Sequence, residues 1–312
     1  MHRLITPYKN TMKNIFTILL AIFVFLTTSL FAQPDRDKDD RIRVIAIFAH
    51  PDDGDAKMGG TAAMLAEMGY AVKFVAITNG DAGHHEEGGG MLAKRRRKEA
   101  AEAGRRLGID EYKVLDNHDG ELLPELHIRQ QVIREIRNWN ADIVLGLRPN
   151  DYHPDHRYAG VLVQDAAYMV VVPNVTPDTP PLKKNPVFLF MEDGFKKPNP
   201  FSHDIVIGID KTFEKKVDAF DAHESQVYEW LPWVSGNLDK VPKDKAKRKE
   251  FLRQGFIGNQ NLSEAKTKGL IKWYGKDKAK QFKYAESFEV CEYGYQPTEE
   301  EIRKLFPMLK KN

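Results

Sequence analysis

The sequence has only one cysteine, Cys291, among its 312 residues. An intramolecular disulfide cannot form, and a zinc site built from several cysteines is excluded. The chain also lacks a strong charge of either sign, with 47 Lys and Arg against 45 Asp and Glu. Internal repeats and coiled-coil heptads are absent as well. With 42% hydrophobic and 29% charged residues, the composition is that of a globular protein long enough to bury a full core.

Neither of the common nucleotide-binding motifs is complete. Gly54–Thr61 follows an apolar run as a P-loop does, but Gly60 stands where that motif requires lysine. A G-x-G-x-x-G pattern is also missing at this point of the chain. The sequence therefore argues against nucleotide binding, and we expect the glycines to allow close packing instead.

One long apolar run, Ile15–Leu26, lies near the start of the chain, after Lys13 and before small residues that end at Ala32. A basic start, an apolar middle and a small-residue end are typical of a secretory signal peptide. A membrane anchor is the alternative, but the run is shorter than the roughly 20 residues that span a bilayer. We expect residues 1–32 to be a cleaved signal peptide, 33–40 to be a charged linker, and the protein to be periplasmic or secreted.

Cleavage after Ala32 would change the charge balance. It removes Arg3, Lys9 and Lys13 and no acidic residue, which leaves 44 basic against 45 acidic residues and a net charge of −1. A nearly neutral chain without a basic stripe argues against nucleic acid as a partner. We also expect no stable membrane insertion after cleavage, and the sequence leaves open whether the protein forms a homo-oligomer.

Short apolar segments alternate with segments of helical periodicity, which predicts an α/β fold with a Rossmann-like, mostly parallel sheet flanked by helices. We expect residues 41–226 to form the catalytic domain and 227–312 a C-terminal extension packed on this core. The predicted strands are 44–48, 71–77, 112–115, 142–147, 187–190 and 204–209, and the predicted helices are 57–68, 92–107, 125–139, 156–169 and 211–224.

Two polar clusters follow predicted strands directly: His50-Pro51-Asp52-Asp53 and His153-Pro154-Asp155-His156. Functional sites of open α/β sheets collect at the carboxyl ends of the strands, so both clusters could converge on one ion. Imidazole and carboxylate ligands suit zinc or a similar divalent metal. With His50, Asp53 and His156 as ligands, a coordination position stays open for water and Asp52 is left beside it as a base. The alternative is that each cluster is an ordinary polar turn.

Two further stretches could border this site. The His84–Glu87 stretch could recruit a second ion, but we interpret it as a solvated loop. The basic run Arg95–Lys98 has the character of a solvated helix face, although one of its arginines could reach a substrate.

Taken together, the motifs resemble the PIG-L, or LmbE-like, family of zinc-dependent N-deacetylases that act on acetylated amino sugars. The resemblance covers roughly residues 42–226. It is carried by Ala49-His50-Pro51-Asp52-Asp53, Thr78-Asn79-Gly80-Asp81, Arg96-x-x-Glu99, His153-Pro154-Asp155-His156 and Lys216-x-x-Ala219-x-x-x-His223-x-Ser225-Gln226.

The resemblance implies a role for each matching residue. His50, Asp53 and His156 would bind one zinc ion, Asp52 would be the general base, and Arg96 would contact the substrate, with Arg95 and Arg97 as neighbours one register away. His153 would stabilise the tetrahedral oxyanion and help to protonate the leaving amine. Asp155 would orient His153.

We therefore expect an N-deacetylase that uses metal-bound water to remove the acetyl group from an N-acetylglucosamine-type sugar or glycoconjugate. Two alternatives stay open from the sequence: a zinc amidase acting on another N-acyl substrate, and a carbohydrate-binding protein without turnover. The intact Asp52 and His153 argue against the second alternative.

The export prediction concerns the mature amino terminus. Because the small-residue segment ends at Ala32, we expect the exported protein to begin at or near Gln33. Intact-mass measurement on protein from the producing cell checks this, and a membrane-bound chain that retains residues 1–32 would contradict it.

Overall fold

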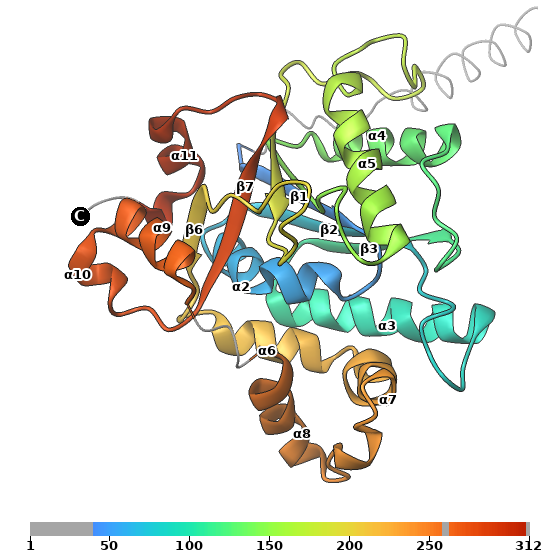
Figure 1. Ribbon diagram of the computed structural model, residues 1–312. Helices are drawn as coiled ribbons and strands as arrows, with labels where there is room; N and C mark the ends of the chain where they lie inside the picture. The colour runs from blue at the N-terminus through green and yellow to red at the C-terminus, as the bar shows by residue number, and fades with distance from the viewer. Residues whose placement is uncertain (1–39, 258–261, 310–312) are drawn as a thin grey trace, which may run out of the picture. The chain divides into compact units, whose positions relative to one another are not determined.

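The computed structural model describes residues 40–257 and 262–309, and from Ile42 onward the chain is one compact unit. Its sheet has seven strands in the order β3-β2-β1-β4-β5-β7-β6 (Figure 1). The strands are β1 (Arg43–Phe48), β2 (Ala71–Thr78), β3 (Glu111–Asn117), β4 (Ile143–Gly146), β5 (Val187–Met191), β6 (Ile205–Gly208) and β7 (Ala285–Gly294). The expected signal peptide and nearly all of the expected linker lie outside the described residues.

The predicted α/β class is confirmed. Strands β3, β2, β1, β4 and β5 run parallel to one another, while β7 is antiparallel to both β5 and β6. The larger helices are α2 (Asp53–Glu67), α3 (Gly89–Leu107), α4 (Leu126–Trp139), α5 (Pro154–Met169), α6 (Phe213–Asp221), α8 (Lys245–Leu252), α9 (Glu264–Tyr274) and α11 (Glu299–Leu305). Shorter ones are the π-helix η2 (Ser225–Trp230), α7 (Leu231–Val234) and α10 (Lys276–Ala279).

Helices cover both faces of the sheet. Helices α2, α3 and α6 contact one another on one face, and α4 contacts α5 on the other (Figure 1). Strand β2 is buried along its whole length and β1 everywhere except at Arg43, which explains why both sequences are mostly apolar. The buried Lys73 of β2 is paired with Glu111 and Glu135. Helix α3 ends as predicted at Gly108, whose φ of 78° is in the left-handed region that favours glycine.

The C-terminal segment contributes a strand to the sheet, which the sequence analysis did not predict. Strand β7 lies between β5 and β6, so part of the expected extension 227–312 is inside the core rather than packed on it. The sequence of β7, AESFEVCEYG, does not indicate a strand inside a sheet, because charged residues interrupt its apolar pattern. Helix α9 packs against the edge strand β6.

A buried ion pair joins β7 to two helices. The Lys216 ammonium group of α6 donates to Glu286 Oε1 at 2.8 Å, and the two side chains are 0% and 2% exposed. The same carboxylate accepts the backbone N–H groups of Gly60 and Thr61 in α2, at 3.0 and 2.7 Å. A Cβ atom on Gly60 would lie 2.7 Å from Ile209 Cδ1, so this glycine does permit close packing, as expected.

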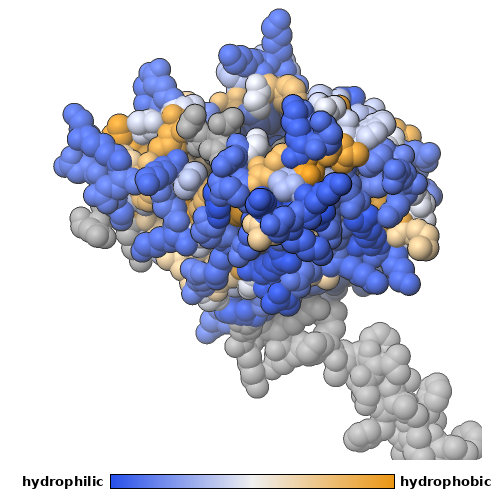
Figure 2. Space-filling model, turned by 90° about the horizontal axis from the view of Figure 1, so that it is seen from below, coloured by the Kyte–Doolittle hydropathy of each residue, from blue (hydrophilic) through white to orange (hydrophobic). Residues whose placement is uncertain are grey.

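Within residues 40–257 and 262–309, none of the helices is long and apolar enough to cross a bilayer. The face seen in Figure 2 is mainly hydrophilic, and its hydrophobic residues gather in small patches. Scattered patches of this kind are normal on protein surfaces.

The buried pair predicts a large stability difference between two glutamates of β7. Glu286→Ala should lower the free energy of unfolding by about 3–5 kcal/mol, because it leaves the Lys216 charge buried and unpaired. Glu292→Ala, at an exposed position of the same strand, should change it by no more than about 0.5 kcal/mol. Urea unfolding of both variants measures the difference, and equal losses would contradict this role for the pair.

Candidate active site

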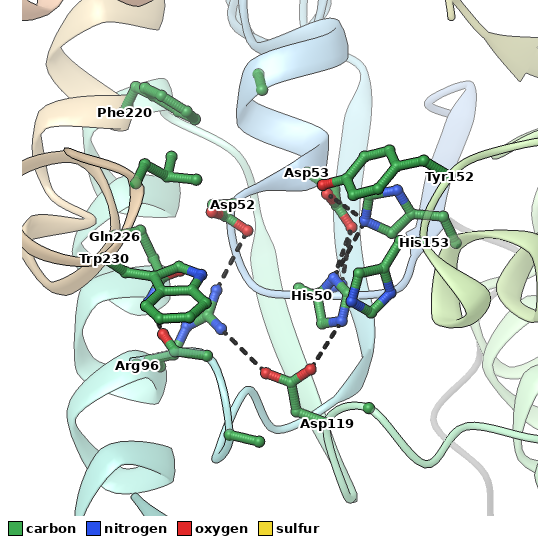
Figure 3. A pocket seen from close by; sticks show the side chains of 16 residues that line it. His50, Asp52, Asp53, Arg96, Asp119, Tyr152, His153, Phe220, Gln226 and Trp230 are labelled. Atoms are coloured by element: carbon green, nitrogen blue, oxygen red, sulfur yellow. Dashed lines mark hydrogen bonds and ion pairs between the residues drawn. The ribbon is translucent and has the colours of Figure 1, made fainter. Parts of the chain in front are cut away.

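Both predicted metal clusters line one cavity of about 360 Å³ at the carboxyl ends of the parallel strands (Figure 3). The loops that follow β1, β2, β3 and β4 all contribute to its wall, as expected for an open α/β sheet. Helices α3, α6 and η2 supply the remaining side. The lining residues are His50, Asp52, Asp53, Ala56, Ala82, Gly83, Arg96, Asp119, Gly120, Tyr152, His153, His156, Phe220, Gln226, Trp230 and Leu231.

The three predicted ligands point at one another. His50 Nδ1 lies 3.2 Å from His156 Nε2 and 3.6 Å from Asp53 Oδ2, and His156 Nε2 lies 3.3 Å from Asp53 Oδ1. Donor atoms held about 2.1 Å from one zinc ion at tetrahedral angles are separated by about 3.4 Å. The two imidazole nitrogens and the Asp53 carboxylate, which faces His50 with one oxygen and His156 with the other, are thus spaced in a way that suits one metal ion.

The second nitrogen of each imidazole faces a carboxylate. His50 Nε2 lies 3.0 Å from Asp119 Oδ1 and 3.2 Å from Asp155 Oδ2, and His156 Nδ1 lies 3.0 Å from Asp151 Oδ1. Histidines that bind metal characteristically use one nitrogen for the ion and give the other N–H to a carboxylate. Two sets of three residues have donor atoms within 4.8 Å of one another, His50-His153-His156 and His50-Asp119-Asp155, and Asp53 is in neither set. Because Asp119 and Asp155 face the second nitrogen of His50, they fit the role of its carboxylate partners better than that of ligands.

The charges around the cluster favour a cation. Burial lowers the pKa of His50, but hydrogen bonds to surrounding carboxylates outweigh it and hold that pKa well above its usual value. Burial likewise opposes the charge of His156, yet Asp53 and Asp151 raise its pKa to about 9. A divalent metal ion supplies the same positive charge and would displace these protons on binding. The donor set therefore suits a metal chemically as well as geometrically.

Asp52 occupies a strained backbone position beside the ligands. Its φ of 139° is rare for a residue with a side chain, and its carboxylate makes no capping hydrogen bond to helix α2. Arg96 stabilises this turn by donating from Nη2 to the Pro51 carbonyl at 2.8 Å and to Asp52 Oδ1 at 3.2 Å. The Asp52 carboxylate is thereby presented to the cavity. Burial raises its pKa to about 6, although the Arg96 charge lowers it.

Arg96 is the arginine of the basic run that lines the cavity, and it is only 2% exposed. Its neighbours have other partners: Arg95 forms a bidentate pair with Glu229, and Arg97 pairs with Asp116. The backbone at Gly80 makes room for the guanidinium, since a Cβ atom there would lie 2.4 Å from Arg96 Nη1. Gly80 also has a φ of 72°, a second reason for glycine at this position.

The structure changes the expected contact of Asp155. Its carboxylate does not contact His153 but accepts from the backbone N–H groups of Gly120 and Leu122 and lies against His50. Its own backbone N–H donates to His153 Nδ1 at 3.2 Å, at the start of α5. The main chain of Asp155 therefore contacts His153, while its side chain contacts His50 and the loop after β3.

Two carboxylates of the site, Asp119 and Asp151, were not predicted from the sequence. Asp119 bridges the two sides of the cavity, because one oxygen faces His50 and the other lies 3.7 Å from Arg96 Nη1 (Figure 3). It comes just after β3, so the strand-end rule that identified the other clusters would also have identified it. Asp81 of the Asn-Gly-Asp motif positions it by accepting the Asp119 backbone N–H at 3.0 Å. Asp151 has no comparable sequence pattern.

The ligand geometry predicts the metal content of point variants. The protein should bind one divalent ion per chain, and His156→Ala and Asp53→Ala should each lose most of it, because each removes one of three ligands. Asp52→Asn and the exposed-histidine control His127→Ala should keep the ion. Elemental analysis after purification without chelator checks this, and full metal content in both ligand variants would refute the ligand set.

The chain is similar to proteins of one known family. The family model "PIG-L: GlcNAc-PI de-N-acetylase" matches residues 45–167. A diacetylchitobiose deacetylase from Thermococcus kodakarensis is 31% identical over 205 residues, which are 62% of this chain and 74% of that protein.

Solved structures show the same fold. The N,N'-diacetylchitobiose deacetylase from Pyrococcus horikoshii superposes with a TM-score of 0.59 at 24% identity, covering 93% of this chain and 95% of the other. GalB, the 4-carboxy-2-hydroxymuconate hydratase of Pseudomonas putida KT2440, has a TM-score of 0.57 at 21% identity and covers 82% and 98%. A hydratase on this fold means that the fold alone does not decide the reaction. The match to the family model and the 31% identity to a deacetylase decide the reaction type. The chain belongs to the PIG-L family and is a hydrolytic N-deacetylase.

Proposed function

We propose that the protein removes the acetyl group from an N-acetylglucosamine-type sugar or glycoconjugate with the help of one divalent metal ion, most simply zinc. The observation that carries this proposal is the convergence of His50, Asp53 and His156 beside Asp52, a carboxylate that lines the cavity and is not one of the predicted ligands. The relative from Thermococcus kodakarensis, named as a deacetylase of diacetylchitobiose, supports an acetylated amino sugar as the substrate. The products would be acetate and a free amine.

The residues divide the chemistry between the two sides of the cavity. A bound zinc ion lowers the pKa of its water to about 7 and polarises a carbonyl oxygen. Asp52 accepts the proton of the attacking water, since it faces the cavity and needs no part in holding the ion. Arg96 keeps the Asp52 carboxylate in place through its 3.2 Å contact and lies where it can also reach a substrate.

His153 acts on the opposite side, next to the ligands. Its Nδ1 accepts the Asp155 backbone N–H, which leaves Nε2 as the nitrogen that carries a proton. That N–H can donate to the oxygen on which charge develops as the amide is attacked. Burial lowers the pKa of His153, and nearby His50 and His156 lower it further, so its neutral form is favoured.

The direct test is a screen of N-acetylated sugars for released primary amine, with and without a chelator. We expect turnover of at least one N-acetylglucosamine derivative, loss of turnover on chelation, and recovery when zinc is returned. Turnover of simple N-acyl amides without any turnover of sugars would favour a zinc amidase of different specificity. Chelator-resistant turnover would contradict the metal mechanism.

The base assignment predicts that Asp52→Asn keeps the fold and the metal ion but loses turnover by about 10²–10⁴-fold, the usual contribution of a positioned general base. Asp277→Asn, an exposed control, should match the wild type in turnover. Measured kcat on the best substrate, together with metal content, separates loss of chemistry from loss of the ion. Near wild-type kcat in Asp52→Asn would make this base assignment wrong.

The oxyanion assignment predicts a smaller but distinct effect. His153→Ala should lower kcat by about 10²–10³-fold, because it removes a hydrogen-bond donor to the developing charge. Its metal content should be unchanged if the ion is held by Asp53 rather than by His153. Loss of the ion in His153→Ala would instead indicate that His153 is a ligand.

A further inference from the structure

We propose that a row of aromatic rings beside the cavity, formed by Trp230, Trp233 and His85, binds further sugar residues of the substrate. The protein would then act on an oligosaccharide chain in preference to a monosaccharide. This inference rests on the proposed function, because it concerns the substrate of the same site. We call these three residues the aromatic row.

The row begins at the cavity itself. Trp230, the last residue of η2, lines the cavity on the side of Arg96 and Gln226, facing the metal cluster (Figure 3). The cavity volume of about 360 Å³ is at the lower end of the roughly 300–1,000 Å³ found for ligand pockets. It has room for one sugar ring carrying an acetamide group, so the next sugar of a chain would lie outside, over Trp230 and its neighbours.

The rings continue from Trp230 towards the surface. Trp233 stacks on Trp230 with ring centroids 5.4 Å apart and planes 16° apart, and His85 stacks on Trp233 at 5.2 Å and 10°. Trp233 remains 49% exposed, an unusual state for the largest apolar side chain. Of the three rings it is Trp233 that keeps wide contact with water, and the part of its indole that the stacking leaves open is apolar surface that a ligand can cover.

Ionic contacts fix the row in place. Glu229, directly before Trp230, accepts two hydrogen bonds from Arg95 at 2.7 Å each and one from His84 at 2.9 Å. The Gln226 amide donates to the Gly83 carbonyl at 3.0 Å. These contacts fasten the loop after β2 to η2. The loop was expected to be solvated, but the His84 and His85 side chains are only 3% and 11% exposed.

An aromatic row that is held in a fixed position suits a sugar ligand. Sugar rings expose apolar C–H faces and polar edges, and a preformed aromatic surface binds such a face without first being ordered. The charged groups beside the row, Glu87, Arg95 and Glu229, can take the sugar hydroxyl groups as hydrogen-bond partners. Because the aromatic row is continuous with the cavity, we assign it to substrate binding rather than to the binding of a separate protein partner.

The test compares chain lengths. We expect kcat/KM for the trimer of N-acetylglucosamine to exceed that for the monosaccharide, and Trp233→Ala to lower the value for the trimer by about tenfold, the effect of exposing roughly 60 Å² of apolar surface. The monosaccharide value should stay unchanged, since Trp233 does not line the cavity. Trp233→Tyr should restore most of the preference for the trimer.

A matched control and a binding measurement complete the design. Tyr168→Ala removes another exposed aromatic residue, 71% exposed near the far end of α5, and should leave both substrates unaffected. Calorimetric titration with the glucosamine trimer, which has no acetyl group to lose, reports binding apart from turnover. Trp233→Ala should weaken this binding by about tenfold as well.

The outcomes separate this inference from the proposed function. If no N-acetylated sugar is turned over but the trimer still binds through Trp233, the function fails and the sugar-binding row stands. If sugars are turned over without a preference for the trimer, or Trp233→Ala lowers the monosaccharide and trimer values equally, the row is not a subsite. Recruitment of a protein by Trp233, with sugar kinetics unaffected, would likewise overturn the inference.

Discussion

The His50 imidazole is the group on which the arrangement of the site depends. One of its nitrogens faces Asp53 and His156, and the other faces Asp119 and Asp155. A single ring thus connects the loops after β1, β3 and β4. Parallel strands make this possible, because their carboxyl ends all meet at one edge of the sheet. The helices and the outer strands serve to hold that edge in a fixed geometry.

The catalytic side of the cavity depends on a different constraint, the Asp52 backbone. A φ of 139° costs on the order of 1–3 kcal/mol, and Arg96 offsets part of this cost through contacts with Pro51 and Asp52. In return the Asp52 carboxylate faces the cavity while Asp53, its neighbour, turns to the metal cluster. Two adjacent carboxylates thereby acquire different surroundings, which is the condition for giving them different roles.

The sequence predicted those parts of the structure that are local. Apolar runs indicated β1 and β4, and the polar residues directly after them indicated the metal cluster. It could not predict contacts that depend on how distant segments meet. Asp151 carries no motif, the contact of Asp155 with His50 requires the packed structure, and β7 contains charged residues whose partners, such as Lys216, are known only from the fold. The position of Trp230 at the cavity also depends on the packing of distant segments, so it could not be predicted from the sequence.

The place of β7 in the sheet has a consequence for how the protein folds. Glu286 meets the N–H groups of Gly60 and Thr61 across 226 and 225 residues of chain. The buried carboxylate that accepts these two N–H groups of helix α2 is therefore available only after nearly the whole polypeptide has been synthesised. Long-range contacts of this kind form slowly. During synthesis, the edge of the sheet that carries the predicted metal ligands would become rigid only after the C-terminal strand β7 has been added. A chain truncated before β7 would therefore contain every predicted ligand but would not hold them in a fixed geometry.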